Sequence, residues 1–325
     1  MRFPGFIDLQ VNGFKGIDFS NPNLSLEDIK FVNQELLKVG TIGYCPTLIS
    51  SSLEVYKRNL SILSRGCQLK AGAKILGIHL EGPFISPEDG NRGIHSKQHI
   101  LEPSIELFEQ FKAWSQNNII LLTIDPSLPD ALELIEHLVG TSETIVSIGH
   151  FNANLEFIKR AVDSGVRCAT HVGNGIKSQI HRHENPLWSI LSEDRIYGLF
   201  ITDGFHIPRE LIVVSLRAKT PSRFIVASDS VFICGMSPGI YDFHGTSVVL
   251  DSNGYLHVQD SEYLAGSAST MLDCMNYLAT LGELGPEDLL RVGFDNAVEL
   301  LNIEKSSLPT NRDSLITLQD NRFYL

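Results

Sequence analysis

The feature that most constrains the fold of this chain is a regular alternation of short apolar runs and amphipathic helical patterns. Eight apolar runs occur up to Ser230, and a helical pattern separates each run from the next. Strands that are buried on both faces read as continuous apolar runs, and strict β–α alternation is typical of a parallel sheet. Eight such units in a chain of 325 residues favour a (β/α)8 barrel over an open doubly wound sheet. No glycine-rich phosphate-binding motif follows a strand, which counts against a nucleotide-binding fold.

The predicted elements follow from these patterns. Ser25 and Asp28 resemble a capping box at the start of the first helix, and Gly40 closes that helix. The predicted strands are residues 3–13, 41–50, 73–84, 118–127, 144–150, 166–175, 195–206 and 223–230. The predicted helices between them are residues 25–40, 54–66, 104–116, 129–139, 154–165, 186–194 and 209–219.

After Ser230 the pattern changes. Residues 235–260 indicate a small hairpin or three-stranded excursion, with Asn253 and Gly254 as a turn. Helical patterns cover residues 267–283 and 286–303, and the tail at 302–325 has room for one or two strands. We expect one domain over residues 1–325, with the barrel spanning residues 3–301.

Composition narrows the choice of partners. The net charge is −12 and no block of lysine or arginine occurs, so nucleic acid and anionic membranes are poor partners. No apolar run reaches the roughly 18 residues of a membrane span, and the first residues lack the apolar core of a secretory signal. The five cysteines are scattered, without a C-x-x-C pair, which is typical of reduced thiols. We therefore expect a cytoplasmic protein that acts on a small molecule.

Polar side chains stand at the ends of the predicted strands. Catalytic groups of a (β/α)8 barrel lie at the C-terminal ends of its strands, where they converge on one crater. A single histidine or aspartate there is usually a hydrogen-bonded structural group or a helix cap, but a series at consecutive strands indicates a site. The strand-end residues are His79 and Glu81 (strand three), His150 (five), His171 (six), Asp203 and His206 (seven), and Asp229 (eight).

These residues have the chemistry of a metal centre. Glu81, His150 and His171 are a suitable set of ligands for one divalent metal ion with an open position for water. Burying the Glu81 carboxylate is expensive unless it is paired or bound to a metal, and a cation removes that difficulty. Asp229 would be the base that accepts a proton from the water. We interpret His79 as a hydrogen-bonded neighbour of the ligands.

The motifs that carry these residues resemble a known family. "HLEGPF", "SIGH", "ATHVGNGI", "TDGFH" and "ASDS", with "PGFIDLQVNG", "RGIH" and "LAGS", are similar to motifs of the amidohydrolase superfamily, and most closely to its N-acetylglucosamine-6-phosphate deacetylases. The resemblance covers roughly residues 3–301. It implies that the chain hydrolyses the N-acetyl group of an amino sugar, with N-acetylglucosamine 6-phosphate favoured, to give acetate and glucosamine 6-phosphate.

The resemblance also implies roles for single residues. It supports Glu81, His150 and His171 as metal ligands and Asp229 as the general acid and base. Arg182 falls where the family has a phosphate-binding arginine that often reaches across a dimer interface, so a homodimer is expected. The other residues that match substrate-contact positions are Ile94, His95, Asn174, Gly175, His206, Leu264, Ala265 and Gly266.

The first strand bears on the number of metal ions. Many amidohydrolases carry H-x-H there and hold two metals, whereas this chain has Gln10 and Asn12, whose neutral amides bind metal poorly. We expect one metal ion, with zinc favoured and iron, manganese or cobalt as alternatives. Gln10 and Asn12 would then be hydrogen-bond donors to water or substrate, or simple strand-end amides. Asp203 is a further candidate for a supporting role beside the site.

The chain also departs from the family pattern. Arg182 stands between His181 and His183 in place of the family's phosphate-binding segment, so these three form either a basic anion site or a solvated loop. The β-sandwich that the family builds from the two ends of its chain is expected here only as a remnant. Two other functions stay open: hydrolysis of another N-acyl or cyclic amide, and a catalytically silent sugar-binding barrel.

Overall fold

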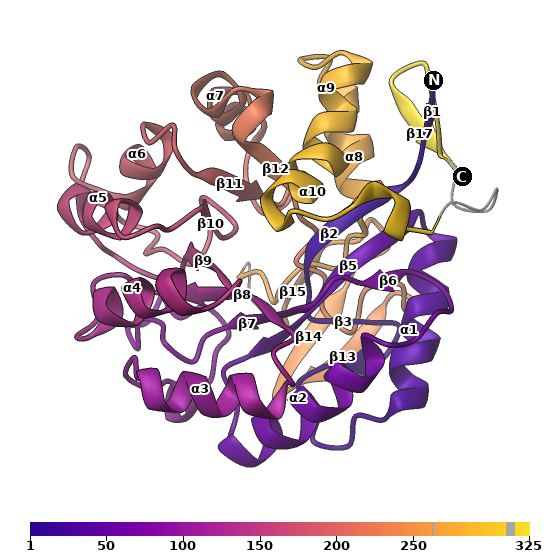
Figure 1. Cartoon of the computed structure of the whole chain (residues 1–325). Coiled ribbons are helices and arrows are strands. Elements are labelled where there is room, and N and C mark those ends of the chain that lie inside the picture. Colours follow the sequence, from indigo (N-terminus) through magenta and orange to yellow (C-terminus); the bar gives the residue numbers. More distant parts are fainter. Residues whose placement is uncertain (262, 310–315) are drawn as a thin grey trace.

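The computed structural model describes residues 1–261, 263–309 and 316–325. Eight parallel strands form a nearly closed barrel, as the alternation predicts (Figure 1). Neighbouring strands pair in the order in which they occur along the chain. The barrel strands are β2 (Phe6–Val11), β5 (Thr41–Ile49), β7 (Ile78–Glu81), β8 (Ile119–Ile124), β9 (Ile145–Ile148), β10 (Cys168–Ala169), β11 (Tyr197–Phe200) and β12 (Phe224–Val226).

Seven helices connect these strands and lie around the outside of the barrel (Figure 1). The capping box predicted for the first of them is present, because Ser25 accepts from the Asp28 amide and Asp28 accepts from the Ser25 amide. The helices are α1 (Leu26–Lys38), α2 (Leu53–Gly66), α3 (Ile105–Trp114), α4 (Ala131–Thr141), α5 (Leu155–Asp163), α6 (Pro186–Leu191) and α7 (Arg209–Lys219).

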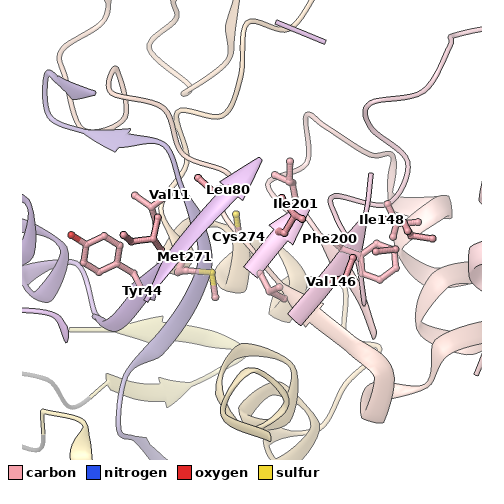
Figure 2. Close-up of a cluster of buried hydrophobic side chains, with 14 of the residues drawn as sticks. Val11, Tyr44, Leu80, Val146, Ile148, Phe200, Ile201, Met271 and Cys274 are labelled. Atoms are coloured by element: carbon pink, nitrogen blue, oxygen red, sulfur yellow. The ribbon is translucent and has the colours of Figure 1, made fainter. Parts of the chain in front are cut away.

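The strands are apolar because both of their faces are buried. Side chains on one face pack against the surrounding helices, in the large cluster of which Figure 2 shows Leu80, Val146, Ile148 and Phe200. Side chains such as Leu121, Leu199 and Ile225 form a second cluster with residues near the C-terminal helix. Alternate residues of one strand therefore serve different packing layers, as period-two geometry requires.

The barrel closes between its first and last strands in a different way from its other seams. In the described structure β2 and β12 share no ladder of paired residues. The contact is made just beyond β12, where Val11 and Ser230 form an isolated parallel bridge. The amides of Asn12 and Gly13 both donate to the Ser230 carbonyl, at 2.8 and 3.2 Å. This seam is important for the site, because Asp229 lies within it.

The segment after the barrel strands forms a small antiparallel sheet of β13 (Gly239–Phe243), β14 (Thr246–Leu250) and β15 (Leu256–Val258). Asn253 and Gly254 lie in the connection between β14 and β15, with Gly254 at φ +90°. The sheet has its own small apolar cluster, which includes Val231, Val248 and Ala265. Two short pairings occur earlier in the chain, β3 (Gly13–Phe14) with β4 (Ile17–Asp18), and β6 (Lys74–Ile75) with β5.

The C-terminal segment returns to the start of the chain. The segment begins with α8 (Met271–Thr280). The helical pattern at 286–303 is interrupted by a π-helical turn and forms α9 (Pro286–Leu290), the π turn Arg291–Asp295 and α10 (Asn296–Leu301). Short 3-10 turns occur at Lys97–His99, Pro221–Arg223 and Lys305–Ser307. Strands β16 (Ile316–Gln319) and β17 (Arg322–Tyr324) form a sheet with β1 (Arg2–Phe3), beside the two labelled ends in Figure 1.

The Phe323 ring fastens this last sheet to the barrel. It contacts Phe3 and Phe6 edge to face, with centroids 5.1 and 5.2 Å away. Part of the predicted tail, residues 310–315, lies outside the described residues. None of the described helices is both long and apolar enough to cross a membrane.

Candidate metal centre and active site

The strand-end residues converge at the C-terminal mouth of the barrel. Glu81 is the last residue of β7, while His150, His171 and Asp229 follow β9, β10 and β12. Glu81, His150 and His171 are buried, and Asp229 is half-buried. His150, His171 and Asp229 have φ of +55°, +28° and +51°, values that residues with a side chain seldom adopt. Such backbone costs on the order of 1–3 kcal/mol per residue and is typical of functional sites.

Three of these side chains meet at one point. Glu81 Oε1 lies 3.0 Å from His150 Nε2 and 2.9 Å from His171 Nε2. The two Nε2 atoms are themselves 2.9 Å apart. A carboxylate oxygen and two imidazole nitrogens that face one another so closely are a ready-made set of metal ligands.

The hydrogen bonds around the cluster support this interpretation. His150 Nδ1 donates to the Asn91 carbonyl at 2.8 Å, which in the neutral tautomer leaves Nε2 as an acceptor beside Glu81 Oε1. Two acceptors facing each other repel unless a proton or a cation lies between them. His171 Nδ1 is buried and has no hydrogen-bond partner among the described residues. The donor set therefore fits a cation bound at the point where the three atoms converge.

The electrostatics of the cluster are those of a buried anion stabilised by imidazoles. Burial raises the pKa of Glu81, but hydrogen bonds and charge interactions with His150 and His171 outweigh it and hold the pKa well below its ordinary value. Burial lowers the pKa of His171, yet the hydrogen bond to Glu81 reverses this, so that the pKa is raised. Glu81 is thus kept as a carboxylate, the form that binds a cation.

Gln10 and Asn12 each donate to a principal member of the site. Gln10 Nε2 donates to Glu81 Oε1 at 2.7 Å, and Asn12 Nδ2 donates to Asp229 Oδ1 at 2.7 Å. These bonds orient the two carboxylates from the first strand of the barrel. The carbonyl oxygens of both amides are buried without partners among the described residues, and Asn12 lines the pocket whereas Gln10 does not.

Asp229 has the environment of a group that exchanges protons. Burial, and next the charge of Glu81, raise its pKa to about 7, against the opposing effects of His171, His206 and the Asn12 hydrogen bond. A bound divalent cation would lower this pKa, because positive charge favours the carboxylate. Asp229 lines the same pocket as the three clustered residues, so it faces whatever is bound there.

His95, on the loop between β7 and α3, is oriented as a donor. Its Nδ1 accepts from the Ser50 amide at 3.2 Å, which places the ring proton on Nε2. His95 Nε2 lies 3.8 Å from Glu81 Oε2 in the pocket. Burial, followed by the charge of His150, lowers the pKa of His95 to about 3, so the ring is neutral.

His206 is oriented in the opposite sense. Its Nδ1 donates to Asp203 Oδ2 at 2.8 Å, and Asp203 Oδ1 accepts from the backbone amides of Phe205 and His206. In the neutral ring this leaves Nε2 as an acceptor. Asp203 therefore determines how His206, which lines the pocket, meets a ligand.

His79 lies one layer below the pocket. Its Nδ1 is 3.3 Å from Thr47 Oγ1 and its Nε2 is 2.8 Å from Thr123 Oγ1, so hydroxyl groups occupy both nitrogens. Burial lowers the pKa of His79 to about 4, which keeps it neutral. It is a hydrogen-bonded core residue beneath Glu81, and it is absent from the metal-ligand cluster.

The pocket contains most, but not all, of the residues predicted from the sequence. Ala265 is buried in the small-sheet cluster, and Arg182 is exposed on the loop before α6; neither lines the pocket. No lysine or arginine is among the described residues that line it. Its predicted members are Asn12, Glu81, Ile94, His95, His150, His171, Asn174, Gly175, His206, Asp229, Leu264 and Gly266.

Sequence reasoning missed three residues of the pocket wall. Ile49, Gly93 and Val231 also line it. Their side chains carry no polar group, so nothing in their chemistry marks them as functional. Their positions were the available signal, since Ile49 ends β5, Gly93 belongs to "RGIH" and Val231 closely follows Asp229.

The fold and the site together define a class of protein. A (β/α)8 barrel with a buried glutamate and two histidines clustered at the C-terminal ends of its strands is the architecture of the metal-dependent amidohydrolase superfamily. A solved mutant of N-acetyl-D-glucosamine-6-phosphate deacetylase from Mycobacterium smegmatis, in complex with N-acetyl-D-glucosamine-6-phosphate, has the same fold. Its TM-score is 0.87 over 98% of this chain and 83% of that chain, at 22% identity.

Curated relatives identify the family within this class. N-acetylglucosamine-6-phosphate deacetylase of Caenorhabditis elegans is 33% identical over 326 residues, which cover 95% of this chain and 76% of the relative. The Bos taurus protein of the same name is 30% identical over 312 residues, covering 93% and 75%. No protein-family model matches the chain. The chain belongs to the N-acetylglucosamine-6-phosphate deacetylase family.

Proposed function

We propose that this chain removes the N-acetyl group from N-acetylglucosamine 6-phosphate, giving acetate and glucosamine 6-phosphate. Membership of the family supports the substrate. The observation that carries the reaction type is the buried cluster of Glu81, His150 and His171, with Asp229 lining the same pocket. A sugar-binding barrel without catalysis has no need of a proton acceptor beside a cluster of metal ligands.

Glu81, His150 and His171 would hold one divalent metal ion, which polarises the amide and activates water when bound. Gln10 and Asn12 supply only amide groups to the first strand, and both side chains already donate to carboxylates. This favours a single ion. Zinc suits a set of two imidazoles and one carboxylate, and iron, manganese and cobalt share those ligand preferences.

The remaining chemistry belongs to side chains of the pocket. His95 Nε2–H donates to the acetamide oxygen and stabilises the negative charge that forms there when water attacks the carbonyl carbon. Asp229, held at Oδ1 by Asn12, accepts the proton of the attacking water. It then delivers that proton to the nitrogen as the C–N bond breaks, so that the products are acetate and a free amine. His206 Nε2 accepts a hydrogen bond from a hydroxyl or amide group of the sugar.

A single chain offers few positively charged groups that could bind the phosphate of the substrate. The described pocket wall has no fixed positive charge, and the Arg182 side chain is exposed outside it. We propose that Arg182 of a second copy of the chain binds the phosphate in a homodimer. If no such pairing occurs, the lack of a fixed positive charge in the described pocket wall makes an unphosphorylated N-acetyl sugar the better substrate, and this is the alternative function.

Acetate release tests both parts of the proposal. The assay compares N-acetylglucosamine 6-phosphate with N-acetylglucosamine, N-acetylgalactosamine and its 6-phosphate. We expect the glucosamine phosphate to have the highest kcat/KM, and Arg182→Ala to raise KM for phosphorylated sugars only. Arg65→Ala, a change of an exposed arginine on α2, is the matched control. Absence of acetate release from all four sugars contradicts the proposed function, and equal kcat/KM with and without phosphate contradicts the phosphate assignment.

A further inference from the structure

The first strand carries a buried acidic residue that the reaction described above does not use. Asp8 lies in β2, is 1% exposed and does not line the pocket. Its Oδ1 accepts from the amides of Ser228 and Gln10, at 3.1 and 3.3 Å, and its Oδ2 accepts from the Ser228 hydroxyl at 2.5 Å. The Asp8 carboxylate thus connects the first strand of the barrel to the residue that immediately precedes Asp229.

Asp8 lies at the seam between the first and last barrel strands, which share no ladder of paired residues in the described structure. Because β2 and β12 are not paired as strands in the described structure, the Ser228 amide has no strand partner and donates to the Asp8 side chain instead. Packing alone does not require an acid here. An apolar side chain would fill the space without the cost of burying a carboxylate, which is several kcal/mol before hydrogen bonds offset it.

The bonds of Asp8 fix the backbone around the proton acceptor. The Ser228 hydroxyl donates to Asp8 and also accepts from the Ser230 amide at 3.1 Å, so both neighbours of Asp229 are held. Asp229 itself has φ +51°, a conformation that persists only where its surroundings enforce it. Asn12 then holds the carboxylate from the same strand that carries Asp8.

We propose that Asp8 is a positioning residue for the deacetylation. Acting through Ser228, it holds the Asp229 carboxylate in the position from which it exchanges a proton with the substrate. This inference rests on the proposed function, in which Asp229 transfers the proton. A displacement of a catalytic group by about 1 Å lowers the rate by about 10². The loss of Asp8 should therefore lower kcat and leave KM nearly unchanged.

A double-mutant cycle separates positioning from a general effect on the fold. We expect Asp8→Ala to lower kcat by about 10- to 10²-fold in the wild-type background, with KM within about threefold. In the Asp229→Asn background the same change should lower kcat by less than about threefold, because the group that it positions is already inactive. Asp8→Asn keeps an acceptor for the Ser228 amide, so it should recover part of the lost kcat.

Two further variants control for folding. Asp125→Ala removes another buried aspartate that is hydrogen-bonded to a serine, Ser127, and should change kcat by less than about threefold. If Asp8→Ala fails to fold, Asp8→Asn and Ser228→Ala decide the question, since each weakens the link without emptying the site. Each should lower kcat in the wild-type background and have little effect beside Asp229→Asn.

Three results would overturn the inference. One is a kcat unchanged by any of the Asp8 and Ser228 variants. Another is an equal loss in the wild-type and Asp229→Asn backgrounds, which would make Asp8 a purely structural residue. The third is a fall in bound zinc that matches the fall in kcat, since Asp8 would then act through Gln10 and Glu81. Full activity of Asp229→Asn alone would instead contradict the proposed function, and the two failures are thus distinguishable.

Discussion

At the scale of single residues, the site depends on how each side chain is held. Glu81 has a donor from β2 and two imidazoles beside it, while Asp229 has Asn12 on one oxygen only. The two carboxylates are therefore suited to different tasks. Glu81 is suited to bind a metal ion, and Asp229 keeps an oxygen for a proton.

Asp229→Asn separates these tasks. The amide is nearly isosteric but cannot accept the proton of the attacking water, so kcat should fall by at least about 10². Bound metal should stay unchanged, because the substitution leaves Glu81, His150 and His171 in place. Acetate release together with metal analysis of the purified protein measures both quantities. A variant that deacetylates at the wild-type rate would show that another group accepts the proton.

Asp8 also gives a prediction for the dependence of stability on pH. Burial is the largest influence on its carboxyl, and although three bonds from Ser228 and Gln10 oppose it, the pKa is raised to about 6. A raised pKa contributes stability that is fully present below the unfolded value near 3.8 and is lost as pH rises through about 6. Asp8→Asn should remove this loss.

The measurement is the free energy of unfolding of the two proteins between pH 4 and pH 7. The difference, Asp8→Asn minus wild type, should shift in favour of the variant as pH rises, by up to about 3 kcal/mol at one pKa unit per 1.36 kcal/mol. Asp125→Asn should behave in the same direction, because burial raises the pKa of Asp125 to about 6 as well. A difference that does not vary with pH would contradict the assigned pKa.

At the scale of elements, the loop after β10 has a strict steric requirement beside the two imidazoles. Strand β10 has only two residues, and the chain then passes through His171 to Gly175 within the pocket. Gly175 has φ +62°, and a Cβ placed there would lie 2.9 Å from His171 Cε1 and 3.0 Å from His150 Nδ1. Only glycine allows the loop to pass this close to the two rings.

Gly175→Ala should therefore displace the imidazoles and weaken metal binding. We expect bound metal and kcat to fall together, by about 10-fold or more, as they do when the surroundings of metal ligands are disturbed. Gly245→Ala is the control, because Gly245 has φ +87° and a Cβ added there would meet nothing within 4 Å. It introduces the same kind of backbone strain without a clash. Equal metal content in the two variants would show that the rings tolerate the added methyl group.

At the scale of the whole molecule, the metal cluster connects strands that are distant along the chain. Glu81, His150 and His171 come from β7 and from the ends of β9 and β10. Glu81 Oε1 and the two Nε2 atoms lie within 3.0 Å of one another, so an ion bound among them should stabilise the folded barrel.

Metal removal tests this contribution. Treatment with a chelator should abolish acetate release and lower the melting temperature, and addition of zinc should restore both. A ligand present at 100 times its Kd stabilises the fold by about 2.7 kcal/mol. Glu81→Ala is the control, because its melting temperature should not respond to chelator or zinc. A wild-type protein that keeps its melting temperature and activity in chelator would contradict the metal centre.

Much of this architecture follows from local patterns that the sequence displays directly. Strand and helix periods are set by residues a few positions apart, so all eight barrel strands and the seven helices between them were predictable. The convergence of Glu81, His150, His171 and Asp229 was predictable too, because parallel barrel strands place their C-terminal ends together. The π turn at Arg291–Asp295 was not, since its residues continue a helical pattern.

Other properties depend on atoms brought together from distant parts of the chain, and only the tertiary structure decides them. The donor sense of His95 depends on Ser50, that of His150 on Asn91, and the bond between Asp8 and Ser228 spans 220 positions. The exclusion of Arg182 from the pocket of its own chain also depends on the path of a loop. Periodicity determines which face of an element is buried, but closure of the barrel determines which hydrogen-bonding atom each buried group meets.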